Sequence, residues 1–166
     1  MHPLFTDMVT CLRQEIELYR HLLALVKRER GYIVSGELKR LADVVRKKEA
    51  VSETLGQLAS GRMSLLEKLA EELGEPLEKL TLARVAQMAP GRTKETLSGL
   101  LNEFRGLVGR LVAANEINRT LLERSLEFVQ GSLNLFRTVS SAGPIYGANG
   151  QIETSTQVLA GLNQTA

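Results

Sequence analysis

The sequence predicts an all-α fold, an elongated antiparallel helical bundle or coiled coil of three long helices and one short one, with a disordered C-terminal tail. Three long segments carry apolar residues at helical spacing, and no segment alternates apolar and polar residues as an amphipathic strand does. The last 26 residues contain one charge among many Gly, Ser, Thr, Asn and Gln residues. The chain therefore divides into a helical bundle domain over 1–139 and a flexible tail over 140–166.

The first predicted helix runs from about residue 5 to residue 35. Its apolar residues recur every seven positions, at Phe5, Leu12, Tyr19, Val26 and Ile33. A seven-residue apolar repeat favours left-handed supercoiling against neighbouring helices. Ser35 and Gly36 mark the end of this helix and the beginning of the next one.

The second predicted helix ends at Leu73, because Gly74 can adopt the left-handed cap conformation and Pro76 prevents continuation. A short helix fits residues 75–88, with the proline in its first turn. Thr93 is the predicted N-cap of the last helix, over 93–139. That helix would span roughly 70 Å if unbroken, which requires an elongated bundle.

Composition predicts an aliphatic interior and limits the partner classes. Hydrophobic residues make up 43% of the chain and aromatic residues only 4%. A net charge of +2 is too small to indicate nucleic acid or an anionic membrane. The sequence contains neither a signal peptide nor an apolar run of membrane-spanning length, so we expect a cytoplasmic protein without membrane insertion. The single cysteine, Cys11, fits a reducing compartment and an apolar environment.

Residue patterns for catalysis, metals and cofactors are missing from the sequence. His2 and His21 are too few and too far apart for a histidine metal site, and no glycine-rich phosphate loop follows a strand. We therefore expect no enzyme, no cofactor and no metal. A basic cluster is interleaved with acidic residues, which favours a solvated surface and leaves an acidic partner or RNA as the alternative; it comprises Lys39, Arg40, Arg46, Lys47 and Lys48.

Two asparagines interrupt the apolar stripe of the last helix. Asn115 and Asn118 lie between Leu111 and Leu121. An amide on such a stripe needs a hydrogen-bond partner and costs stability while it fixes helix register or oligomeric state. The alternative is that these amides line a place where a partner helix is exchanged. Whether the free protein is a monomer or a homodimer stays open.

Four features, in order along the chain, resemble the FlgN family of flagellar type III export chaperones. They are EIELYRHLLALVKRE in the first helix, VVRKKEAV in the second, NEINRTLL in the last helix, and IYGANGQ in the tail. The resemblance covers about residues 4–151. Asn149 stands where the family commonly has Asp, and residues 76–93 match nothing in the family pattern.

The resemblance implies a cytoplasmic chaperone that binds hook–filament junction (hook-associated) proteins, prevents their premature assembly and delivers them to the flagellar export gate. It implies that Tyr146, with neighbouring Ile145 and Gly147, contacts the cytoplasmic domain of the export-gate membrane protein. The C-terminal helical segments of the junction proteins would lie on the last helix. The predicted cargo-binding residues are Leu111, Asn115, Asn118, Leu121, Leu122, Phe128, Val129 and Phe136.

Two other functions fit the sequence. One is a structural coiled-coil protein with an inert tail. The other is a helical nucleic-acid-binding module that uses the basic cluster over 39–48, with binding that weakens steeply as salt rises.

Overall fold

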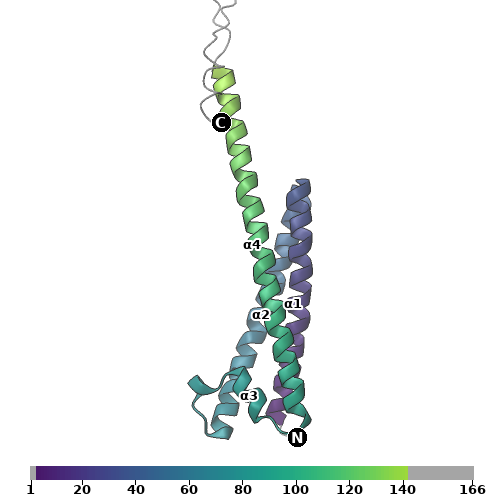
Figure 1. The fold of residues 1–166 in the computed structure, drawn as a ribbon, viewed down its shortest axis with the longest axis vertical. Coiled ribbons are helices and arrows are strands. Elements are labelled where there is room, and N and C mark those ends of the chain that lie inside the picture. The colour runs from purple at the N-terminus through teal and green to yellow at the C-terminus, as the bar shows by residue number, and fades with distance from the viewer. Residues whose placement is uncertain (1–2, 142–166) are drawn as a thin grey trace, which may run out of the picture. The chain divides into compact units, whose positions relative to one another are not determined.

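The computed structural model describes residues 3–141, and the all-α prediction is confirmed within that range. Three long helices and one short one are present, together with a 3-10 turn, and residues 3–141 include no strand. The elements in chain order are α1 (Pro3–Ser35), α2 (Leu38–Leu73), η1 (Leu77–Lys79), α3 (Leu82–Met88) and α4 (Arg92–Ser141) (Figure 1). The predicted disordered tail, apart from its first two residues, lies outside the described residues.

Two compact units divide the chain, Met1–Leu122 and Glu123–Ala166, and their boundary falls within α4. In the first unit α1 and α2 form an antiparallel hairpin, and the first part of α4 packs against both (Figure 1). The connection between α1 and α2 is tight because Gly36 has a positive φ of 70°, which side chains with a Cβ rarely adopt.

Gly74 ends α2 as the sequence predicts. Its φ is 64°, in the left-handed region, and the N–H of Glu75 donates to the carbonyl of Ala70 at 3.1 Å. This closing bond satisfies a carbonyl that the end of the helix would otherwise leave unpaired.

The prediction of one short helix over 75–88 is wrong. The segment splits into η1 and α3, and between them lie Leu80, which is buried, and Thr81, which is exposed. The side chain of Thr81 accepts a hydrogen bond from the N–H of Arg84 at 3.2 Å, so this threonine caps α3. The predicted cap at Thr93 is also wrong, because α4 begins at Arg92 and Thr93 lies in its first turn.

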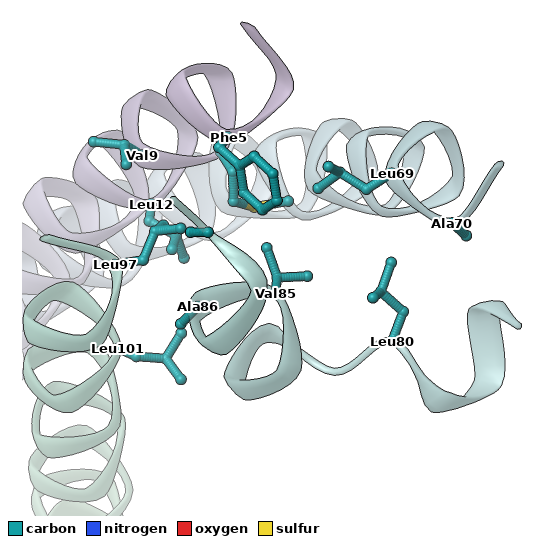
Figure 2. Close-up of a cluster of buried hydrophobic side chains, with 12 residues drawn as sticks. Phe5, Val9, Leu12, Leu69, Ala70, Leu80, Val85, Ala86, Leu97 and Leu101 are labelled. Atoms are coloured by element: carbon teal, nitrogen blue, oxygen red, sulfur yellow. The ribbon is translucent and has the colours of Figure 1, made fainter. Parts of the chain in front are cut away.

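An aliphatic cluster closes the end of the bundle where α3 lies. Figure 2 shows its side chains converging from α1, α2, the α3 segment and α4. Val85 of α3 is fully buried, and burying a side chain of this size stabilises the fold by about 1.5–3 kcal/mol. The buried members are Phe5, Met8, Val9, Leu12, Leu69, Ala70, Leu80, Val85, Ala86, Ala89, Leu97 and Leu101.

A second cluster fills the middle of the bundle. Tyr19 of α1 meets Phe104 of α4 edge to face, with ring centroids 5.2 Å apart. The buried members of this second cluster are Ile16, Leu22, Leu23, Val26, Leu55, Leu107, Leu111 and Ala114. The two clusters are chiefly aliphatic, as the low aromatic content led us to expect.

Candidate functional site

A buried ion pair interrupts the apolar interior between α1 and α2. Glu15 lies seven residues after Met8 and seven before Leu22, on the buried row of α1, and is only 1% exposed. Arg62 of α2 forms a salt bridge with Oε2 of Glu15 and lies 5.7 Å from the centroid of the Phe104 ring. Oε1 of Glu15 has no hydrogen-bond partner among the described residues. Burial raises the pKa of Glu15, and the charge of Arg62 partly opposes that shift.

A second polar layer joins α1, α2 and α4. Asn118 is 2% exposed, and its amide nitrogen donates to the Val26 carbonyl and to Oε2 of Glu29, both at 2.8 Å. Arg30 Nε donates to Oδ1 of Asn118 at 3.1 Å, and Lys48 Nζ lies 2.7 Å from Oε2 of Glu29. Both the nitrogen and the oxygen of the buried Asn118 amide are therefore hydrogen-bonded to residues of α1. This pairing fixes the alignment of α4 with α1.

Asn115 behaves differently from Asn118. The structure places it on the exposed side of α4, so the prediction that both asparagines lie on the buried stripe is wrong for this one. The reason is the seven-residue repeat, in which Leu111 is followed on the buried row by Asn118.

The helical part of the second unit has an uncovered apolar face. At about 100° per residue, its large apolar side chains share roughly half of the helix circumference with Ser125 and Ser132. The other half carries charged and polar residues, including Glu127, Asn134 and Arg137. The exposed fractions of the apolar residues run from 52% to 77%. We call these residues the α4 apolar face: Leu126, Phe128, Val129, Leu133, Leu135, Phe136 and Val139.

An amphipathic helix normally packs its apolar half against other side chains. Phe128 and Phe136 are instead 77% and 69% exposed. A contiguous apolar surface of this kind marks a binding site for another apolar surface. The α4 apolar face is therefore the candidate functional site.

The structure separates the predicted cargo-binding residues into two groups. Phe128, Val129 and Phe136 belong to the α4 apolar face. In the first unit, Leu122 is 38% exposed and Leu121 is partly buried, whereas Leu111 and Asn118 lie in the interior. The predicted gate-docking residues Ile145, Tyr146 and Gly147 lie outside the described residues.

Sequence reasoning missed the two buried glutamates. Glu15 and Glu29 occupy the same row of α1 as Met8 and Leu22. A carboxylate at a repeat position that is otherwise apolar is the signal that could have identified them.

Other candidate chemistry is absent from the described residues. No group of His, Cys, Asp and Glu over residues 3–141 could hold a metal ion, and no helix in that range is long and apolar enough to cross a membrane. Cys11 is buried, and its thiol donates to the Leu58 carbonyl at 3.8 Å. Burial, and then the charge of Glu15, raise the pKa of this thiol, which disfavours the reactive thiolate.

Comparison with known proteins gives two matches. The sequence model of the FlgN protein family matches residues 1–154. The chain is also similar to the uncharacterized protein YvyG of Bacillus subtilis (strain 168), with 26% identity over 124 residues that cover 75% of each chain. No solved structure matches. Since the family match covers nearly all of the sequence, this chain belongs to the FlgN family.

Proposed function

We propose that this protein is a cytoplasmic export chaperone that binds hook-associated junction proteins, keeps them unassembled and delivers them to the flagellar export gate. Membership of the FlgN family supports a flagellar export chaperone role and the binding of hook-associated proteins. The observation that carries the cargo-binding step is the α4 apolar face, seven large apolar side chains left exposed on one helix.

The cargo would be an amphipathic helix from the C-terminal segment of a junction protein. Leu126, Val129, Leu133 and Phe136 follow each other at intervals of three and four residues, which is the spacing of anchors in a helix–helix seam. Burying each of them fully contributes about 1.5–3 kcal/mol before the cost of ordering the partners. The predicted contacts at Leu111 and Asn118 would require the bundle to open first, because both are buried.

The experiment is a binding titration of a hook-associated protein, with and without its C-terminal segment, against the full chain. Leu133→Ser with Phe136→Ser should weaken binding of the intact cargo by about a hundredfold, since each residue contributes more than 1.4 kcal/mol. The matched control is Gln130→Ser with Asn134→Ser, on the polar half of the same segment. If both double variants bind the cargo equally well, the α4 apolar face is not the cargo site.

Delivery to the gate is assigned to the segment 140–166, which we propose acts as a separate tether beyond the helical domain over 1–139. In this proposal Ile145, Tyr146 and Gly147 dock on the cytoplasmic domain of the export-gate protein. Tyr146→Ala should then weaken binding to the purified gate domain and leave the cargo affinity unchanged. An equal loss of both activities would contradict this division.

A further inference from the structure

Positive charge is concentrated around the connection between α1 and α2. Residues 27–48 contain eight basic and three acidic residues, hence a net charge of +5. The rest of the chain contains thirteen basic and sixteen acidic residues, hence −3. This basic region surrounds Gly36, at the end of the hairpin far from the N-terminus (Figure 1). Its field would attract an acidic partner to this end of the first unit.

A groove of about 150 Å³ lies between the two helices in this region. Leu25 and Val44, which are both buried, contribute its apolar floor. We call it the tip groove; it is lined by Leu25, Arg28, Tyr32, Arg40, Asp43, Val44 and Lys47.

The cations on the rim of the tip groove differ in whether a carboxylate already forms an ion pair with them. Arg40 is paired with Glu37 at 2.9 Å, and the one carboxylate of the rim, Asp43, is already paired with Arg46. Arg28 and Lys47 are exposed and have no ion-pair partner among the described residues. Two cations are therefore available to an incoming carboxylate.

Besides its charged groups, the groove is lined by the apolar side chains of Leu25 and Val44 and by the ring of Tyr32. A partner segment that presents carboxylates together with an apolar side chain would satisfy the unpaired cations and cover this apolar lining at the same time.

We propose that the tip groove is a second docking site, which binds an acidic amphipathic segment of a partner protein. A protein segment fits better than a nucleic acid because the groove has an apolar floor formed by Leu25 and Val44. Proteins that bind single-stranded nucleic acid usually add stacking aromatic residues, whereas Tyr32 is the single aromatic residue of the lining. This site is separate from the α4 apolar face and does not depend on the proposed export function.

The test uses the full chain with Leu133→Ser and Phe136→Ser, which weakens peptide binding to the α4 apolar face. Three fluorescent probes are titrated: a helical peptide of about 20 residues with Leu on one side and Glu on the other, the same peptide with Lys in place of Glu, and a single-stranded oligonucleotide of similar length. Arg28→Glu with Lys47→Glu should weaken binding of the acidic peptide by about tenfold or more. Lys68→Glu with Lys94→Glu, which changes the net charge equally on exposed positions elsewhere, should have little effect.

Three results would overturn the proposal. They are no binding of the acidic peptide at about millimolar concentration, equal weakening by the control charge reversal, or preferential binding of the oligonucleotide that Arg28→Glu with Lys47→Glu abolishes. Circular dichroism checks that each variant folds. The milder pair Arg28→Gln with Lys47→Gln should give a smaller loss in the same direction, which keeps the test valid if the charge reversal perturbs the bundle.

Discussion

Replacing Arg62 with leucine should destabilise the bundle severely, because it leaves Glu15 buried without its partner. Glu15 is 1% exposed, and one of its carboxylate oxygens already lacks a hydrogen-bond partner among the described residues. Breaking a buried pair in this way costs about 3–5 kcal/mol, a large part of the 5–15 kcal/mol that is typical of a folded domain. The pKa of Glu15 is raised by burial, so the carboxyl can take up a proton and the loss should shrink as pH falls.

The measurement is urea unfolding at neutral pH followed by far-ultraviolet circular dichroism, since the chain contains no tryptophan. The control is the double replacement Glu15→Leu with Arg62→Leu, which removes both charges and should leave the free energy of unfolding within about 1 kcal/mol of the parent or above it. A loss below about 1 kcal/mol for Arg62→Leu, or a double variant as unstable as the single one, would refute the reasoning.

Three further predictions use the same unfolding assay. Because the pKa of Glu15 is raised in the folded state, its contribution to stability falls as pH rises from the ordinary glutamate value of 4.5 through the raised pKa; Glu15→Gln should flatten that decline, and an unchanged slope would contradict it. Asn118→Leu removes the paired amide between α1 and α4 and should cost about 1–3 kcal/mol, whereas no loss would mean that the apolar replacement packs equally well. Gly61→Ala, in open space within α2, should stabilise the fold by up to about 1 kcal/mol. Gly74→Ala, at a φ of 64°, should destabilise the fold by about 1 kcal/mol. Stability changes of the same sign for the two variants would contradict this pair of predictions.

The long helices could be predicted because their apolar periodicity and the Gly74 cap are local signals. The break at Thr81 was missed because the pattern over 75–88 also fits one helix. Its real cause is a side-chain cap next to Leu80, a residue held in the core by other helices. Tertiary packing therefore decided the local structure of this segment.

The candidate site could be located only in part from the sequence. The apolar stripe of α4 continues from Leu97 to Phe136, and nothing in the stripe itself shows which residues α1 and α2 cover. The structure places Leu111 in the interior and leaves Phe128 and Phe136 exposed. Glu15 and Glu29 were missed because charged residues on a helix are usually assigned to its solvated side.

The two ion pairs of the α1–α2 hairpin also favour one register of α2 against α1 over others. Glu15 and Glu29 are separated by the same fourteen residues as their partners Lys48 and Arg62 on the antiparallel helix. Sliding α2 by one heptad would bring a leucine opposite Glu15 in place of Arg62, and its charge would lose its counterion. Another helix that replaced α2 with an uninterrupted row of leucines would likewise leave Glu15 and Glu29 without counterions. For the apolar helical cargo proposed above, the same loss of counterions would disfavour its insertion into the α1–α2 hairpin in place of α2.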